Sequence, residues 1–205
     1  PQIMGAINQF YEDNLECGLT NPDEQRLHDL DNSYLKNNNH IVWIKTPQQS
    51  EFREQQIGTS LTNEKEIEII DSICQKFEQT WSVRVKQGQP RKEIGIITFY
   101  GRQLKLIESR IDPKKFPSLH IRTGTVDRFQ GMERQVIIVS MVRNNNQKRV
   151  GFAKTPERVN VAFSRAQELL VIIGCHPLFT QFPIYSKVAH IVSLHGGLID
   201  VSDIL

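Results

Sequence analysis

The sequence predicts an α/β fold, a mostly parallel β-sheet with helices on both faces. Three apolar runs rich in β-branched residues, at 94–98, 136–139 and 169–174, have the length and composition of buried strands. Segments with helical spacing separate these strands. This alternation of strand and helix implies right-handed crossovers, which give a parallel sheet covered on both sides.

Length and composition narrow the class of protein. The chain has 205 residues, of which 39% are hydrophobic and 23% charged, so it can bury a normal core as one domain. Its net charge of +2 is too small to indicate a nucleic-acid partner, although one face can still be basic. No apolar run approaches the length of a membrane span, so no membrane partner is expected.

The cysteines and the first residues bear on location. Cys17, Cys74 and Cys175 are isolated and odd in number, which favours a reducing, intracellular location, cytoplasmic or nuclear. The chain begins Pro-Gln without Met, as a fragment of a longer protein would.

Residues 1–62 are expected to be the irregular part of the domain. Apolar residues at helical spacing predict a helix over 2–11 that ends before Gly18, and 41–44 predict a short strand that Pro47 ends. Residues 48–61 are expected to form a polar loop. Gly58 in this loop belongs either to an ordinary turn or to a backbone contact with a ligand.

Residues 63–180 are expected to hold the sheet core. Asn63 followed three residues later by Glu66 is a capping-box pattern that starts a helix with an apolar face. Further elements are expected in this order: a strand at 94–98, a helix at 101–111, a short strand at 119–121, a buried strand at 136–139, a helix from Pro156 and a strand at 169–174. Residues 181–205 are expected to be a C-terminal extension of the same domain, which spans 1–205.

Polar residues stand where the expected strands end. Thr98 and Tyr100 lie between a buried strand and a helix, where a hydroxyl and amides can hold a phosphate and a ring can stack on a base. The competing interpretation is a turn whose aromatic residues fill the layer between helix and sheet.

A second polar group surrounds the strand at 136–139. The turn 127–133 (DRFQGME) must lie at an edge of the sheet, where ligands of open α/β sheets bind. Its carboxylates suit acid–base or metal chemistry, or else a capped helical turn, and no His or Cys nearby completes a ligand set. Arg165, near the end of the expected helix, is either a phosphate-binding donor or a solvated surface charge.

Two nucleotide-binding patterns are missing. The chain contains no G-x-x-x-x-G-K-[ST] phosphate loop, and Gly101 lacks the glycine spacing of a dinucleotide fingerprint. The chain therefore has no recognisable cradle of its own for β- and γ-phosphates.

Several segments together resemble superfamily 1 helicases. Residues 125–133 (TVDRFQGME), with the following run 136–144, are similar to motif V, and residues 158–166 (RVNVAFSRA) are similar to motif VI. The similarity is to the branch that contains the nonsense-mediated-decay RNA helicase, senataxin and the nuclease-helicase of Okazaki-fragment processing. Residues 94–100 (IGIITFY) resemble its I-G-I-I-T-P-Y strand, with Phe99 in place of proline, and residues 1–15 resemble the segment after its Q-Y-R-M motif.

The resemblance implies a RecA-like domain of the P-loop NTPase type that lacks its own P-loop, the second of the two in such a motor. It implies that Arg165 is the arginine finger that reaches the γ-phosphate. The nucleotide-binding positions it implies are Gln130, Gly131, Glu133 and Arg165, and the nucleic-acid-binding positions are Thr98, Tyr100 and Thr125. ATP and Mg²⁺ would be held mainly by a first RecA-like domain absent from this chain, and no metal ligand is expected here.

The sequence thus predicts the C-terminal motor domain of an ATP-dependent DNA or RNA helicase or translocase, inactive as an isolated fragment. Its partners would be the first RecA-like domain and single-stranded DNA or RNA. The alternative is a non-motor module for nucleic-acid binding or interaction that retains the fold. A small-molecule enzyme is a third interpretation, but the sequence shows no nucleophile, base or cofactor fingerprint for it.

Overall fold

The computed structural model describes residues 2–18 and 20–205. Its centre is a six-stranded sheet in the order β5-β4-β6-β7-β1-β8, and every neighbouring pair of strands is parallel. The strands are β1 (Ile41–Thr46), β4 (Lys92–Thr98), β5 (Leu119–Thr125), β6 (Arg134–Ser140), β7 (Ala166–Cys175) and β8 (Leu198–Asp200). The predicted α/β fold with a parallel sheet is confirmed.

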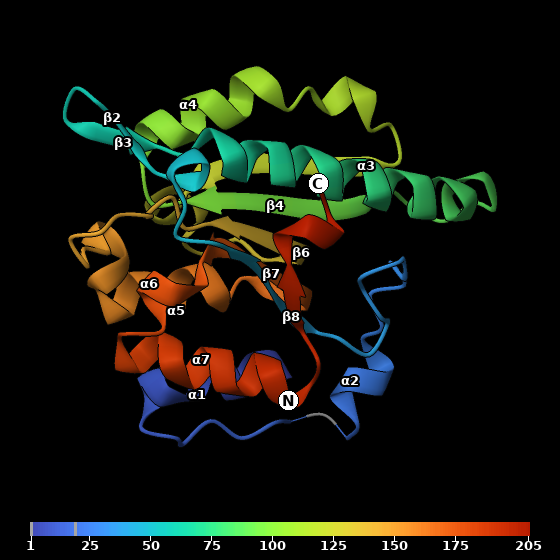
Figure 1. Ribbon diagram of the computed structural model, residues 1–205. Helices are drawn as coiled ribbons and strands as arrows, with labels where there is room; N and C mark the ends of the chain where they lie inside the picture. The colour runs from blue at the N-terminus through green and yellow to red at the C-terminus, as the bar shows by residue number, and fades with distance from the viewer. Residues whose placement is uncertain (1, 19) are drawn as a thin grey trace.

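Helices cover both faces of this sheet, as predicted (Figure 1). One face carries α3 (Glu64–Lys86) and α4 (Gly101–Arg110), and the other carries α1 (Gln2–Asn8), α5 (Pro156–Phe163), α6 (His176–Phe179) and α7 (Pro183–Leu194). Consecutive strand residues point to opposite faces. In β6, Val136 and Ile138 therefore pack in the layer with α3, whereas Ile137 and Val139 pack in the layer with α5 and α7.

The remaining helices are short. They are α2 (Pro22–Gln25) and the 3-10 helices η1 (Gln9–Tyr11), η2 (Ser50–Phe52), η3 (Pro113–Lys115), η4 (Val126–Phe129), η5 (Gly151–Lys154) and η6 (Val201–Asp203). In the described ranges no helix has the length and apolar character to cross a membrane.

Two strands of the sheet come from outside residues 63–180, the range in which the sequence predicts the sheet core. β1 pairs with β7, and β8 pairs with β1 at the edge of the sheet. β8 has only three residues, too few to show a strand period in the sequence. The sheet therefore draws on the N-terminal part and on the C-terminal extension as well.

Residues 48–61 do not form the predicted polar loop. They contain η2 and an antiparallel hairpin of β2 (Gln55–Ile57) and β3 (Ser60–Thr62). Gly58 stands in its turn with φ of +62°, a conformation that favours glycine, which supports the ordinary-turn interpretation. β2 is exposed along its whole length, so the apolar alternation typical of a strand is missing from its sequence.

Other predicted elements differ from the structure mainly at their ends. α1 ends at Asn8, and η1 continues it to Tyr11, where Glu12 and Asp13 turn the chain with φ of 55° and 58°. β5 is longer than the predicted 119–121 and pairs with β4 along its whole length. It lies at the edge of the sheet, and only Leu119 and Gly124 of its residues are buried, which hides it from a search for continuous apolar runs.

The connection from β5 to β6 crosses over β4 through η4. Phe129 in η4 is fully buried and lies on the sheet where Gly95 of β4 and Gly124 of β5 have no side chains. A Cβ at Gly95 would lie 2.9 Å from Phe129 Cε1, and one at Gly124 would lie 2.6 Å from Phe129 Cδ2. The two glycines therefore allow Phe129 to pack closely on β4 and β5. The connection then brings residues 130–133 to the amino end of β6.

Candidate functional site

The residues singled out from the sequence lie at opposite edges of the sheet. Thr98 and Thr125 are the last residues of β4 and β5 and pair with each other at the carboxyl edge. Glu133 directly precedes β6, and Arg165 directly precedes β7, so both lie at the amino edge. The predicted site residues therefore form two separate groups, one at each edge of the sheet.

At the amino edge, the turn 130–133 meets the segment around Arg165. The backbone N–H of Arg134 donates to the carbonyl oxygen of Arg165 at 3.0 Å, and Gln167 Nε2 donates to Glu133 Oε2 at 3.1 Å. Gln130, Gly131 and Glu133 are exposed, and Gly131 has φ of +79°. Motifs V and VI therefore form one continuous surface at this edge.

The sequence predicted Arg165 near the end of a helix. In the structure α5 ends at Phe163, so Arg165 lies just beyond it. Its half-buried side chain folds back on the end of that helix: Nε donates to Val161 O at 3.0 Å, and Nη2 donates to Ser164 Oγ at 3.1 Å. A cation there is favoured by the unpaired carbonyls and the dipole of the helix. In the described ranges no carboxylate forms an ion pair with Arg165, so its other guanidinium N–H groups stay available.

The carboxylates of the turn have ordinary partners. Asp127 Oδ2 accepts from Arg158 Nη2 at 3.1 Å, and both side chains are exposed. Among residues 2–18 and 20–205, no three His, Cys, Asp or Glu side chains gather in a way that could hold a metal ion.

At the carboxyl edge, the three predicted nucleic-acid residues differ in accessibility. Thr98 is fully buried, and its Oγ1 has no hydrogen-bond partner among the described residues. Tyr100 is only 5% exposed, whereas Thr125 is half-buried. The Tyr100 ring lies 5.3 Å, centroid to centroid, from the ring of Phe152 in η5, and its hydroxyl accepts from Arg143 Nη1 at 3.3 Å.

Glu54 fixes the segment that follows β6. Its Oε2 accepts from Arg143 Nε at 2.9 Å, Asn144 N at 2.7 Å and Asn145 Nδ2 at 3.0 Å. A hydrogen bond that involves an ionised group is stronger than one between neutral groups. The segment after β6 is thereby held against the residues that lead into β2.

Glu66 is the most deeply buried acid at this edge. It does not complete the capping box: Asn63 Oδ1 accepts from the Glu66 N–H, but the Glu66 carboxylate accepts from Ser140 Oγ at 2.6 Å and Val142 N at 2.9 Å. Val142 has φ of 67°, a strained conformation for a β-branched residue that the carboxylate helps to hold. Burial raises the pKa of Glu66 to about 8, and the hydrogen bonds from Ser140 and Val142 oppose that shift.

Sequence reasoning missed Glu54, Glu66, Arg143 and Phe152 as parts of this edge. One signal for Arg143 was present, since polar residues 143–145 follow directly on the apolar run of β6. Nothing in the sequence indicates that Glu54 and Glu66 lie beside them, because their partners are 74 to 91 positions away.

Comparisons with known proteins identify the family of this chain. Residues 1–177 match the family described as an AAA domain, AAA_12. The Drosophila melanogaster "Regulator of nonsense transcripts 1 homolog" is 32% identical over 173 residues, 82% of this chain. MOV-10 of Gallus gallus is 36% identical over 137 residues, 60% of the chain. The Bos taurus "DNA replication ATP-dependent helicase/nuclease DNA2" is 33% identical over 121 residues, 58% of the chain.

These matches cover 14%, 14% and 11% of the relatives' own lengths, so the chain corresponds to a small part of each. The relatives belong to the group that the sequence motifs indicated. The parallel sheet with its two helical layers is the RecA-like fold expected of that group. The chain therefore belongs to the AAA_12 family of AAA domains, within the superfamily 1 helicases.

Proposed function

We propose that this chain is the second, C-terminal RecA-like domain of an ATP-dependent superfamily 1 DNA or RNA helicase or translocase. The observation that carries this proposal is the junction of the turn 130–133 with Arg165 at the amino ends of β6 and β7. One relative is named as an ATP-dependent helicase/nuclease, which supports an ATP-driven activity for the whole protein.

ATP and Mg²⁺ would be held mainly by a first RecA-like domain that packs against this edge. This chain would add Gln130, Gly131 and Glu133 beside the nucleotide and the Arg165 guanidinium opposite the γ-phosphate. The N–H groups that Val161 and Ser164 leave available can donate to phosphate oxygens and neutralise the charge that develops as the phosphoryl group departs.

Single-stranded nucleic acid would follow the carboxyl edge, near Thr98, Tyr100 and Thr125. The unpaired Oγ1 of Thr98 is one donor that a small opening of this edge would make available. An intracellular location, cytoplasmic or nuclear, belongs to the same proposal and is compatible with the free Cys17, Cys74 and Cys175.

The test is ATP turnover of the complete protein, with both RecA-like domains, with and without a single-stranded oligonucleotide. Arg165→Ala should abolish most of the stimulated turnover, and Arg110→Ala, an exposed arginine at the end of α4, should not. Turnover that survives Arg165→Ala would favour the alternative, a nucleic-acid binding or interaction module without a motor role for this domain.

A further inference from the structure

Phe152 is an exposed aromatic residue whose ring packs against other side chains. Its side chain is 52% exposed, which is unusual for phenylalanine beside a core. The ring rests on buried Tyr100, and the Arg158 guanidinium lies 5.1 Å from its centroid. The ring is therefore oriented by its neighbours while much of its surface faces solvent.

The loop that carries Phe152 is held at both ends. Gly151 has φ of +55°, and a Cβ there would overlap Tyr100 Oη and Arg143 Nη1, so the backbone lies directly on that pair. Asn145 closes the other end: its Oδ1 accepts from Gln147 N and Arg149 N, each at 3.1 Å, and its Nδ2 donates to Arg149 O at 2.8 Å. A ring on such a loop loses little conformational freedom when it binds.

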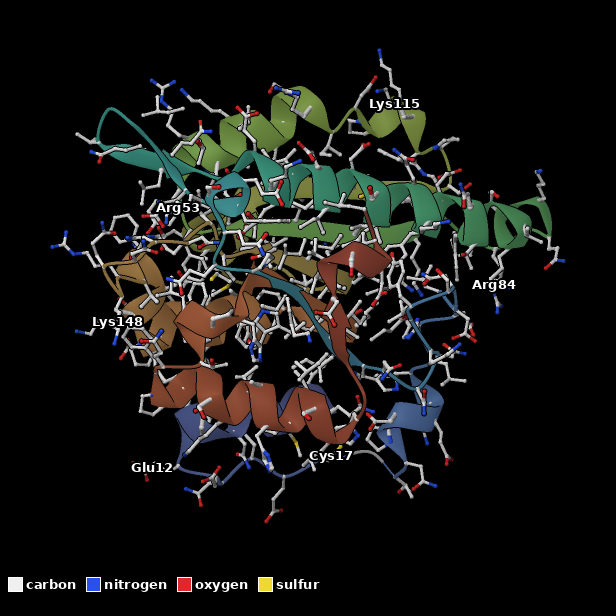
Figure 2. The ribbon with its side chains drawn as sticks, viewed as in Figure 1. Glu12, Cys17, Arg53, Arg84, Lys115 and Lys148 are labelled. Carbon is white, nitrogen blue, oxygen red and sulfur yellow. The ribbon has the colours of Figure 1, made fainter. Side chains whose placement is uncertain are left out.

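The charges around this ring are positive. Residues 143–158 contain five basic residues, Arg143, Lys148, Arg149, Lys154 and Arg158, and a single acidic one, Glu157. Arg143 pairs with Glu54 and Arg158 with Asp127, so the basic border of the ring comes from the other three. Lys148, Arg149 and Lys154 are exposed. Figure 2 shows Lys148 projecting outward beside the loop, on the side toward which β4 points. An exposed ring with a basic border suits a ligand that alternates flat bases with phosphates.

We propose that Phe152, rather than Tyr100, is the base-stacking residue of this domain, on a platform formed by residues 143–154 that binds single-stranded nucleic acid. This inference rests on the proposed function. Tyr100 is then a positioning residue, because its ring supports Phe152 from below and its hydroxyl holds Arg143. The platform lies beside Thr98 at the carboxyl edge, so it extends the same track.

The test is binding of a fluorescently labelled oligouridylate and an oligothymidylate to the complete protein, followed by fluorescence anisotropy at low salt. Loss of one stacked base costs roughly 1–3 kcal/mol, so Phe152→Ala should weaken binding by about 5- to 150-fold. Phe152→Trp should keep near wild-type affinity, because stacking needs only an aromatic face. Leu194→Ala, which removes a 68% exposed side chain at the end of α7, is the matched control.

The outcomes separate this inference from the proposed function. A wild-type protein that binds neither oligonucleotide contradicts the proposed function and this inference with it. Wild-type binding with an unchanged Phe152→Ala affinity and an unchanged melting temperature overturns only the stacking role of Phe152, as it would if the ring instead docked another protein.

Discussion

At the scale of single residues, Arg165 has one observed role and one proposed role. Its present contacts, to Val161 O and Ser164 Oγ, are those of a residue that caps the carboxyl end of α5. The proposed catalytic role uses the N–H groups that these contacts leave available. Capping and catalysis predict different consequences for stability and for turnover.

We expect Arg165→Lys and Arg165→Ala to lower single-strand-stimulated ATP turnover of the complete protein by about a thousandfold or more, the usual contribution of an arginine finger. Lysine keeps the charge but loses the planar fork that spreads over a phosphoryl group. Steady-state phosphate release measures the effect. If capping is the whole role, turnover will stay near wild type and only the melting temperature will fall.

Glu66 gives a residue-scale prediction about pH. Its folded pKa, about 8, lies above the ordinary value of 4.5, so the folded state binds this proton more tightly than the unfolded state. Stability from this group is therefore greatest below about pH 4.5, falls as pH rises, and is lowest above about pH 8. Glu66→Gln cannot ionise and should be less sensitive to pH in this window, by on the order of 5 kcal/mol.

Urea unfolding of wild type and Glu66→Gln between pH 5 and pH 9 checks this. Glu64→Gln, a substitution of an exposed residue two positions earlier, controls for the change in net charge. The same pH slope in wild type and Glu66→Gln would show that Glu66 does not take up a proton on folding.

At the scale of elements, the connection from β5 to β6 depends on the two glycines under Phe129. Gly124→Ala would place a Cβ 2.6 Å from Phe129 Cδ2, and that ring is fully buried. We expect a loss of about 1–3 kcal/mol of unfolding free energy, as for other overpacked cores. The shift in the midpoint of urea denaturation measures it.

Gly101→Ala is the matched control for Gly124→Ala. Gly101 begins α4, and no heavy atom would lie within 4 Å of an added Cβ. Alanine there should be neutral or stabilise the domain by up to about 1 kcal/mol, because it restricts the unfolded chain and favours helix. Equal losses for both variants would show that Phe129 does not require the glycines.

At the scale of the whole molecule, the sheet separates the two proposed ligands. The amino edge, where the nucleotide is proposed to bind, holds Glu133 and Arg165. The carboxyl edge, where the nucleic acid is proposed to bind, holds Thr98, Thr125 and the Phe152 platform. The chain forms only one wall of the proposed nucleotide site, since it has no phosphate loop. Activity should therefore depend on a partner domain.

We expect the isolated chain to bind ATP weakly and to show no steady single-strand-stimulated turnover, although the complete protein does. Phosphate release assayed side by side, with circular dichroism to show that the isolated chain is folded, measures this. Sustained stimulated turnover by residues 1–205 alone would contradict the division of the site between two domains.

The sequence alone determined those features of this protein that depend on residues close together in the chain. The apolar runs at 136–139 and 169–174 indicated buried strands, because a strand covered on both faces must be apolar throughout. Asn63 marked the start of α3, because helix starts depend on nearby backbone N–H groups. The motifs around residues 125–133 and 158–166 indicated the family that the comparisons confirmed.

Only the tertiary structure decided which distant residues meet. Glu66 was interpreted as a partner of Asn63, but its carboxylate bonds to Ser140 and Val142, because packing α3 on the sheet places them closer. The sequence left Tyr100 open between a base-stacking ring and a ring that fills the layer between helix and sheet. The fold buries it under Phe152, which carries no motif signal. Short strands such as β2 and β8 were hidden for a related reason. Their pairing is fixed by backbone hydrogen bonds to other strands, which leave no period in the side chains.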